Sequence, residues 1–374
     1  MVRDVTISDR SLAIAWADGH RSLFHAVWLR DHCPCPDCRH PTTGQRLLET
    51  AAIADTLRLT AGRFTGDAVA IAWSDQHGAA FDPAWLRQHC YCDADRAPDR
   101  PPRRFWRPEG RAGLPEARHA DVVADEGALR EWLAAIDAYG FAVLHAVPVV
   151  PGEVTRVAEL FGYVRETNYG RLFDVRSVVN PNNLAYTGLG LSCHTDNPYR
   201  DPTPTLQLLH CLSSSAEGGD SLLVDGFEVA ERLRATDPEP FGLLSRVPVP
   251  FRFRDDDADL AAESPVIALD VRDRVVAIRL NNRSKAPLRI ESGLVEPWYA
   301  AYRTFARMLD APGVQLRFKL APGDLFVVDN LRVLHGRTAF AGAGQRHLQG
   351  CYADMDGLRS KLAVLERARA GAAA

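Results

Sequence analysis

The first hundred residues of this 374-residue chain contain an internal repeat at an offset of 57 positions. Residues 12–33 and 69–90 align with 12 identities in 22 positions, a match that chance does not explain in a segment of mixed composition. The pattern of each copy predicts a strand, an Asp-centred turn, a second strand and a short helix that carries Trp-Leu-Arg. Two such units predict a small β-rich domain, which we place at residues 1–95.

Three cysteines fall within six residues at the end of the first copy, at Cys33, Cys35 and Cys38. Thiols this close, in a loop stiffened by prolines, can converge on one Zn²⁺ ion, and in an intracellular protein a metal is more expected than disulfides. A tetrahedral site needs a fourth ligand, and the candidates are His77, His89, Cys90 and Cys92. His77 lies at a predicted turn, where its ring can lean outward. The competing interpretation is three reduced thiols in a loop.

A zinc ribbon that binds nucleic acid is the alternative function for this segment. Such ribbons carry two cysteine knuckles with basic flanks, and the pair Cys90-Tyr-Cys92 makes a poor second knuckle. The net charge of -4 and the isoelectric point near 6.3 also argue against a nucleic-acid surface, which would be basic. We therefore expect a structural zinc and no nucleic-acid partner.

Residues 96–120 are rich in Pro and Arg, lack an apolar period and predict a linker. The remaining segment, residues 121–374, combines a few helices with many short alternating strands separated by turns. This pattern predicts an α+β domain built on a double-stranded β-helix, the jelly-roll. A final helix at residues 357–369 is the expected contact of a homodimer. No apolar run has membrane length and the first residues are too polar for a signal peptide, so we expect a cytoplasmic protein without a membrane partner.

His194 and Asp196 stand one residue apart in the segment Leu-Ser-Cys-His-Thr-Asp. On a strand, side chains two positions apart point to the same face, so an imidazole and a carboxylate can hold one metal from adjacent corners. His335, which follows an apolar run at residues 325–328, is the best third ligand. Two histidines and a carboxylate leave three octahedral positions open, as in the facial triad of non-haem Fe(II) oxygenases. The competing interpretation is a turn and a surface histidine.

An iron of this kind needs a co-substrate that chelates it, and 2-oxoglutarate does so through its keto-acid end while O₂ takes the last position. The far carboxylate of 2-oxoglutarate needs a fixed cation, and a guanidinium can clamp it through two parallel hydrogen bonds. Arg346 lies 11 residues beyond His335, which suits the next strand of the barrel running antiparallel to the metal strand. Ser221 is the expected hydroxyl partner on a neighbouring strand. The alternative for Arg346 is a solvated surface arginine.

Several segments resemble one known family. They are His194-Thr-Asp196-Asn-Pro-Tyr199, Gln207-Leu-Leu-His-Cys211, Gly218-Gly-Asp-Ser-Leu-Leu-Val-Asp-Gly226, Asp329-Asn-Leu-Arg-Val-Leu-His335-Gly-Arg337 and Arg346-His-Leu-Gln-Gly-Cys-Tyr352-Ala-Asp354. The chain resembles the γ-butyrobetaine dioxygenase family and its trimethyllysine dioxygenase relatives, and residues 28–38 resemble the zinc domain of those enzymes. The resemblance implies a jelly-roll domain, Fe(II), 2-oxoglutarate, O₂, ascorbate as a candidate reductant and often a homodimer. It also implies that the zinc ligands are Cys33, Cys35, Cys38 and His77.

A trimethylammonium head offers no hydrogen-bond donor and is held best by the faces of aromatic rings. The rings expected around the mouth of the barrel are Tyr169, Phe173, Tyr186, Tyr199 and Tyr352. The resemblance implies a cage at each of these positions except Tyr199. Phe173 departs from the Trp of animal relatives and has a weaker quadrupole, so the specificity of the cage is open. The alternative is that these rings are ordinary barrel core.

The anionic end of the substrate is assigned by the resemblance to polar segments that contain Asn183, Asn282 and Arg283. Arg283 suits a carboxylate, as in γ-butyrobetaine, and equally a phosphonate, as in 2-trimethylaminoethylphosphonate; a loop arginine facing water is the third interpretation. The predicted reaction is hydroxylation of γ-butyrobetaine to L-carnitine, with the trimethylammonium phosphonate or trimethyllysine as alternative substrates. A non-catalytic zinc-binding interaction protein is the alternative from another class, and the intact triad with Arg346 disfavours it.

Overall fold

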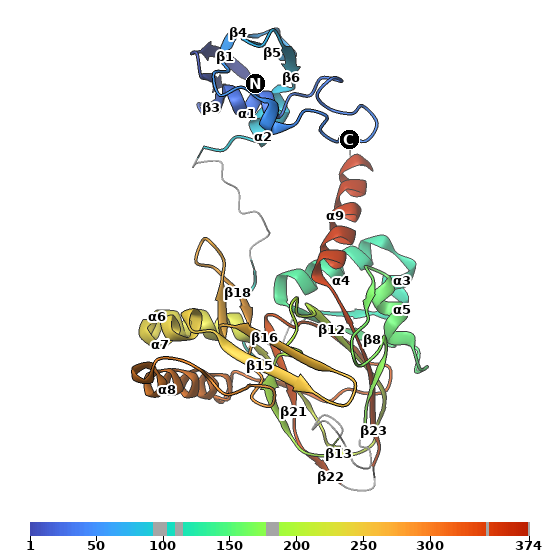
Figure 1. Cartoon of the computed structure of the whole chain (residues 1–374). Helices are drawn as coiled ribbons and strands as arrows, with labels where there is room; N and C mark the ends of the chain where they lie inside the picture. Colours follow the sequence, from blue (N-terminus) through green and yellow to red (C-terminus); the bar gives the residue numbers. More distant parts are fainter. Residues whose placement is uncertain (93–102, 109–114, 177–186, 342–343, 373–374) are drawn as a thin grey trace. The chain divides into compact units, whose positions relative to one another are not determined.

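The computed structural model describes residues 1–92, 103–108, 115–176, 187–341 and 344–372. The chain divides into two compact units, Met1–Pro101 and Pro102–Ala374, which are coloured along the sequence in Figure 1. The predicted linker, residues 96–120, spans this division. Its later part belongs to the second unit, where Trp106 is buried and residues 116–118 form a strand.

The first unit contains two copies of one motif, as the repeat predicts. Each copy has three antiparallel strands and a short helix, and begins with one strand more than the repeat indicates. The first copy comprises β1 (Val2–Ile7), β2 (Ser11–Trp16), β3 (Arg21–His25) and α1 (Ala26–Asp31), and a 3-10 turn follows at Thr50–Ala52. The second copy comprises β4 (Leu59–Phe64), β5 (Val69–Trp73), β6 (Gly78–Phe81) and α2 (Pro83–Gln88).

Alternation of burial explains why the two copies pack together. In β2 and in β5 every second side chain is buried, as expected for strands with one face on a core. Leu12 and Ile14 of the first copy share this core with Trp73 of the second. The helices α1 and α2 bring Trp28 and Trp85 together, with ring centroids 5.6 Å apart. The duplicated halves therefore bury one common core rather than two separate ones.

Two sheets form the frame of the second unit. The larger has seven strands in the order β10-β23-β12-β20-β8-β7, with β9 beside β23, and the smaller has the order β11-β21-β14-β19. The larger comprises β7 (Glu116–Arg118), β8 (Phe141–His145), β9 (Val164–Arg165), β10 (Phe173–Val175), β12 (Leu206–Ser214), β20 (Leu325–Asp329) and β23 (Arg346–Ala353). The smaller comprises β11 (Leu191–His194), β14 (Ser221–Asp225), β19 (Leu316–Phe318) and β21 (Val333–Arg337). Three two-stranded pairs complete it: β13 (Glu217–Gly218) with β22 (Phe340–Ala341), β15 (Val249–Arg254) with β16 (Asp259–Ser264), and β17 (Ile267–Leu269) with β18 (Val275–Ile278).

The helices of the second unit form two groups, which Figure 1 separates clearly. The helices α3 (His119–Ala124), α4 (Glu126–Tyr139), α5 (Glu153–Glu159) and α9 (Met355–Ala372) lie on one side, and α6 (Gly226–Thr236), α7 (Pro238–Arg246) and α8 (Ser292–Leu309) on the other. In α4 the spacing of Leu129, Trp132, Leu133 and Ile136 places all four against the larger sheet. Gly140 ends this helix at a φ of 79°, where a side chain would be strained. Within the described ranges, no helix combines the length and apolar character that a membrane span requires.

The two sheets face each other across a shared core. Leu209 and Phe326 of the larger sheet belong to one hydrophobic cluster with Leu223 and Val333 of the smaller. The larger sheet is mixed, because β7 runs parallel to β8 whereas the other strands pair antiparallel. Two opposed sheets with helices outside are consistent with the predicted jelly-roll.

The strand that begins at Arg346 is not the neighbour of the strand that carries His335. β21 pairs with β11 and β14 in the smaller sheet, whereas β23 pairs with β10 and β12 in the larger. The prediction that the two strands run side by side is therefore wrong. The short link between them crosses from one sheet to the other, which a spacing of 11 residues does not reveal.

A buried ion pair ties the smaller sheet to the surrounding segments. Arg332 and Asp225 have side chains that are each 1% exposed, and Arg332 donates to Asp225 at 2.8 and 3.1 Å. The guanidinium also donates to the carbonyls of Ala138 and Arg104, at 2.8 and 2.7 Å. The carboxylate accepts the backbone N–H of Trp106. Both members of the pair thus have further hydrogen-bond partners, which is what makes a charge tolerable in a core.

Candidate active site

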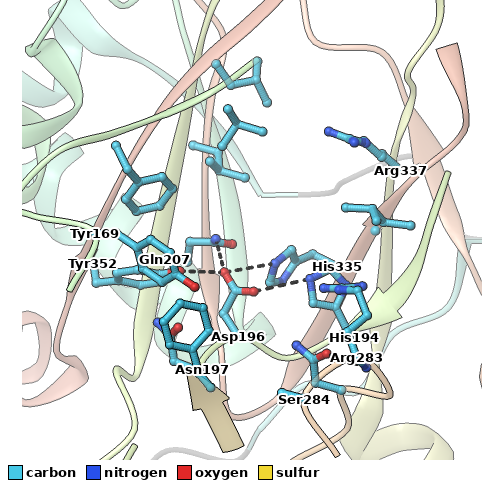
Figure 2. A pocket seen from close by; sticks show the side chains of 18 of the residues that line it. Tyr169, His194, Asp196, Asn197, Gln207, Arg283, Ser284, His335, Arg337 and Tyr352 are labelled. Carbon is cyan, nitrogen blue, oxygen red and sulfur yellow. Dashed lines mark hydrogen bonds and ion pairs between the residues drawn. The ribbon is translucent and has the colours of Figure 1, made fainter. Parts of the chain in front are cut away.

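The three predicted metal ligands meet at the edge of the smaller sheet. His194 ends β11, Asp196 follows it, and His335 lies on β21 directly opposite His194 in the strand register. Their donor atoms all lie within 4.8 Å of one another. Nε2 of His194 is 3.3 Å from Oδ1 of Asp196, and Nε2 of His335 is 3.7 Å from Oδ2. Figure 2 shows both imidazole rings pointing at this carboxylate.

The hydrogen bonds of His194 determine which ring nitrogen is available to a metal. Its Nδ1 lies 2.8 Å from the carbonyl oxygen of Ser192, which can only accept, so Nδ1 carries the proton. Burial lowers the pKa of His194 to about 4, and the neutral ring then presents a lone pair at Nε2. That lone pair faces a carboxylate oxygen, an arrangement that a cation between the two would stabilise. The geometry of these side chains therefore fits a divalent metal.

The carboxylate of Asp196 is held in place by its neighbours. Its Oδ2 accepts hydrogen bonds from Nε2 of Gln207 at 2.5 Å and from the hydroxyl of Tyr352 at 2.8 Å. Its backbone N–H donates to the side chain of Asn330, whose amide donates back to the carbonyl of Asp196. Burial favours the neutral acid, but the adjacent His335 and His194 outweigh it and hold the pKa of Asp196 well below its ordinary value. Asp196 is thus an ionised, oriented ligand.

A cavity of about 580 Å³ opens between the two sheets and contains the triad. Side chains of the smaller sheet, including His335 and Arg337, form one wall, and side chains of the larger sheet, including Gln207, Arg346 and Tyr352, form the opposite wall. A volume of this size suits a small molecule, and ligand sites of this kind are mostly apolar with a few fixed polar groups. The cavity is therefore the place where a substrate would meet a bound metal.

Aromatic rings follow one another along the cavity from the triad outward. The centroid of Tyr352 lies 5.1 Å from that of Phe173, which lies 6.2 Å from that of Tyr169. Phe253 continues the row, 5.8 Å from Tyr169 and 5.2 Å from Tyr199. The hydroxyls of Tyr169 and Tyr199 are 2.9 Å apart. These rings line the cavity rather than only filling the barrel core.

Cationic side chains lie on both walls of the cavity. Arg346 is 9% exposed and donates its Nε to the carbonyl of Gly219 at 3.2 Å, and burial lowers its pKa. Ser221, also buried, pairs in register with Arg337, whose pKa burial lowers to about 10. No Asp or Glu among the described residues forms an ion pair with Arg346. Arg346, Arg337 and Ser221 thus line the same cavity as the triad.

Comparison with known proteins identifies this architecture. Residues 108–352 match the family model described as taurine catabolism dioxygenase TauD, TfdA family, and residues 4–87 match the model of the gamma-butyrobetaine hydroxylase-like N-terminal region. A gamma-butyrobetaine dioxygenase of Pseudomonas sp. (strain AK-1) is 41% identical over 95% of this chain and 94% of its own. The chain belongs to the γ-butyrobetaine dioxygenase family. The human gamma-butyrobetaine dioxygenase is 34% identical over 95% of this chain and 94% of its own, and a trimethyllysine dioxygenase of Meyerozyma guilliermondii is 30% identical over 96% and 94%.

Membership of the γ-butyrobetaine dioxygenase family confirms three predictions made from the sequence. The resemblance was correct over nearly the whole chain, and the enzyme is a 2-oxoglutarate-dependent dioxygenase. Its cofactor and co-substrates are Fe(II), 2-oxoglutarate and O₂. Which side chains bind the iron and 2-oxoglutarate is inferred from the geometry of the cavity.

The predicted anion-binding residues of the dioxygenase have mixed outcomes. Arg283 lines the cavity and is at the same time exposed to solvent. Asn282 is exposed and is not part of the cavity lining, whereas its neighbour Asn281 is buried there and donates to the carbonyl of Thr195 at 3.0 Å. The alternation of the chain at this point turns one asparagine inward and the next outward. Two further predicted residues, Asn183 and Tyr186, lie outside the described ranges.

Sequence reasoning missed several residues that line the cavity of the dioxygenase. Phe253 comes from the β15–β16 hairpin, and Asn197, Gln207 and Ser284 also line the cavity. The segment 249–254, Val-Pro-Phe-Arg-Phe-Arg, alternates between apolar and basic residues and could have been predicted as a strand. Nothing local in that pattern indicates that its Phe reaches a tyrosine far away in the chain.

The predicted zinc ligands are brought together in the first unit of the dioxygenase. The donor atoms of Cys33, Cys35, Cys38 and His77 lie within 4.8 Å of one another. Nε2 of His77 is 3.2, 3.4 and 3.5 Å from the three sulfurs, in chain order. Arg30 donates to the sulfur of Cys38 at 3.0 Å, which suits a thiolate. His77 rather than His89 is thus the nearby histidine, as the resemblance implies.

Proposed function

We propose that this enzyme hydroxylates a small trimethylammonium compound, and that γ-butyrobetaine, converted to L-carnitine, is the substrate. The observation that carries the proposal is the cavity in which an aromatic row continues directly from the His194, Asp196 and His335 triad. The names of the relatives support it, because a gamma-butyrobetaine dioxygenase is more similar to this chain than the trimethyllysine dioxygenases are.

The proposed iron ligands are His194, Asp196 and His335. Fe(II), when bound with 2-oxoglutarate and O₂, supplies the oxidising power to hydroxylate an unactivated C–H bond while 2-oxoglutarate is converted to succinate and CO₂. The protein contributes position rather than proton transfer. Gln207 and Tyr352 keep the carboxylate turned toward the histidines.

The proposed partners of 2-oxoglutarate are Arg346 and Ser221. A buried guanidinium without a carboxylate partner among the described residues is ready to pair with the far carboxylate of the co-substrate. Ser221 adds a hydroxyl from the facing sheet. Arg337 lies one strand over from Ser221 and adds positive charge to the same region.

The proposed cage for the trimethylammonium head consists of Tyr169, Phe173, Tyr199, Phe253 and Tyr352. Each ring face attracts a quaternary cation by about 0.5–2 kcal/mol, depending on how dry the contact is. Phe173, where the resemblance implies a Trp in animal relatives, keeps a face in the row. Arg283 is the proposed partner of the anionic end, because it lies on the same cavity and carries the opposite charge. Cage and arginine together would fix which carbon faces the metal.

The first unit has a proposed structural role. We propose that Cys33, Cys35, Cys38 and His77 hold a zinc ion that stabilises the packed repeats. A cluster of three thiols around one histidine is typical of metal binding in a reducing compartment, and we propose a cytoplasmic enzyme on that ground. A homodimer, with the terminal helix as contact, stays a prediction.

The reaction can be tested with a panel of substrates. Enzyme, Fe(II) and 2-oxoglutarate in air would be mixed with γ-butyrobetaine, trimethyllysine, 2-trimethylaminoethylphosphonate or a neutral analogue with carbon in place of the quaternary nitrogen. We expect succinate and a product with one added oxygen atom from γ-butyrobetaine above all. Equal turnover of the neutral analogue would contradict the cage. The absence of succinate with every compound would contradict the oxygenase chemistry itself.

The cage can be tested separately at Phe253. Phe253→Leu removes a π face, whereas the matched variant Phe253→Tyr keeps one. We expect KM for the trimethylammonium substrate to rise roughly 2- to 30-fold in Phe253→Leu only, the range that corresponds to about 0.5–2 kcal/mol. KM for 2-oxoglutarate should change in neither variant. An equal effect of both substitutions would indicate packing rather than cation–π attraction.

A further inference from the structure

A second group of metal-ligating side chains lies in the first unit. Nε2 of His20 is 3.5 Å from the sulfur of Cys90 and 3.4 Å from that of Cys92. The three donor atoms lie within 4.8 Å of one another, the same limit that the Cys33 cluster meets. Cys90 is buried, and His20 and Cys92 are half-buried. We propose that His20, Cys90 and Cys92 form a second site for Zn²⁺ or another thiophilic divalent cation.

The internal repeat relates this group to the proposed zinc cluster. Adding 57 to His20 gives His77, and adding 57 to Cys33 or to Cys35 gives Cys90 or Cys92. Each copy of the repeat therefore supplies thiols to one group and a histidine to the other. The pairing is reciprocal: thiols of the first copy face the histidine of the second, and thiols of the second copy face the histidine of the first.

The histidine of each group lies at the end of an equivalent hairpin turn, one in each copy of the repeat. The backbone N–H of His20 donates to Asp18 at 3.0 Å, and that of His77 donates to Asp75 at 3.2 Å. The carbonyls of both histidines accept from the tryptophan that ends the preceding strand, at 2.9 Å in each case. Two unrelated surface histidines would not share these contacts. His20 is thus presented to its thiols in the way His77 is presented to the cluster of three.

An arginine crosses between the copies beside each group. Arg30 of the first copy donates to Asp75 at 2.8 Å, and Arg87 of the second donates to Asp18 at 3.4 Å. Each guanidinium also lies over the tryptophan of the opposite copy, with 5.9 and 5.8 Å to the ring centroids. The polar frame around the two groups is thus duplicated along with their ligands.

The distances suit a tetrahedral metal. With Zn–S near 2.3 Å and Zn–N near 2.0 Å at tetrahedral angles, neighbouring sulfur and nitrogen atoms lie about 3.5 Å apart. The separations of 3.4 and 3.5 Å from His20 match this edge. Three protein ligands leave one position for water or another donor. We therefore expect weaker binding here than at the cluster of four, and earlier loss to a chelator.

Metal content tests the proposal on the full-length protein. The variant His335→Ala serves as the background, so that zinc in the iron site does not add to the count. We expect two equivalents of zinc per chain in this background, and one after the further change His20→Ala or Cys92→Ala. His40→Ala, a histidine of the same unit outside both groups, should leave two. One equivalent in the background protein, unchanged by His20→Ala, would overturn the proposal.

A second measurement needs no variant and so does not depend on folding of a mutant. Zinc-loaded wild-type protein would be treated with a chelator of moderate strength and with a thiol alkylating reagent, and the labelled cysteines would be located by mass spectrometry. We expect Cys90 and Cys92 to be protected by zinc and to be labelled before the Cys33 cluster as chelator is raised. Labelling at a rate independent of zinc, or a disulfide between Cys90 and Cys92, would overturn the proposal.

Discussion

Replacing Tyr352 by Phe separates two tasks that this residue combines. Its ring belongs to the aromatic row, 5.1 Å from Phe173, and its hydroxyl donates to Oδ2 of Asp196 at 2.8 Å. Burial, aided by the charge of Asp196, raises the pKa of this phenol well above its ordinary value, so it stays a donor at every working pH. Phe keeps the ring face and removes only the donated hydrogen bond.

The size of the effect follows from the environment of the carboxylate. Hydrogen bonds to charged groups contribute about 1.5–3 kcal/mol, and losing an outer partner of a metal ligand costs roughly 10- to 100-fold in metal affinity or activity. These ranges agree, because tenfold is about 1.4 kcal/mol. Gln207 still donates to the same oxygen of Asp196, so the carboxylate keeps one of its two side-chain donors. We expect Fe(II) affinity in Tyr352→Phe to fall about tenfold, at the lower end of the range.

Anaerobic titration of Fe(II) in the presence of 2-oxoglutarate, followed by visible absorption, measures this affinity directly. KM for the trimethylammonium substrate at saturating iron should change less than threefold, since the π face remains. Tyr169→Phe is the matched control, because its hydroxyl contacts Tyr199 rather than Asp196. Iron affinity within twofold of wild type in Tyr352→Phe, or an equal loss in Tyr169→Phe, would refute the reasoning.

Three further substitutions test other parts of the structure. Asp225→Asn should destabilise the enzyme by about 3–5 kcal/mol in urea unfolding, because it leaves the buried charge of Arg332 without its partner; a loss below 1 kcal/mol would show that the core does not depend on the pair. Arg346→Met should raise KM for 2-oxoglutarate about 10- to 100-fold in steady-state assays, because it removes a charge-assisted contact worth about 1.5–3 kcal/mol. KM for the trimethylammonium substrate should change little. If only the KM of the trimethylammonium substrate rose, the arginine would belong to that substrate's site instead. Gly350→Ala would place a methyl group 2.5 Å from the ring of Phe173. We therefore expect the folded state to lose about 1–3 kcal/mol of stability and KM for the trimethylammonium substrate to rise. Thermal unfolding like that of wild type would contradict the close contact.

The pair His194 and Asp196 could be predicted from the sequence because its geometry is local, whereas His335 joins it through strand pairing. The spacing of His194 and Asp196 predicts that both lie on one side of the chain. The apolar run before His335 forms β20 of the larger sheet, whereas His335 itself lies on the following strand, β21, of the smaller sheet. The register then sets His335 directly opposite His194. Arg346 lines the cavity, but its strand lies in the larger sheet and not, as the sequence predicted, beside the strand of His335. Spacing along the chain limits how far a residue can reach and does not say which of two facing sheets receives it.

The aromatic row shows where sequence reasoning ends. Tyr199 ends a segment that resembles the family and Tyr169 matches a cage position that the resemblance implies, whereas Phe253 lies in a hairpin with no motif of its own. Its alternating pattern predicts a strand, yet the contact with Tyr199 at 5.2 Å depends on how the hairpin folds back over the cavity. That folding is decided by packing between distant segments. Such contacts become visible only in three dimensions.

The internal repeat predicts a second metal site as well as the fold of the first unit. If two copies of a motif pack so that thiols of the first face a histidine of the second, thiols of the second copy should also face the histidine of the first, unless one of these residues has changed. Applied to His77 and its thiols, this rule alone selects His20, Cys90 and Cys92. The position that corresponds to Cys38 holds Asp95, which lies outside the described residues. The two copies therefore differ in one donor, and that difference is why we expect two zinc ions that leave a chelator-treated enzyme one after the other.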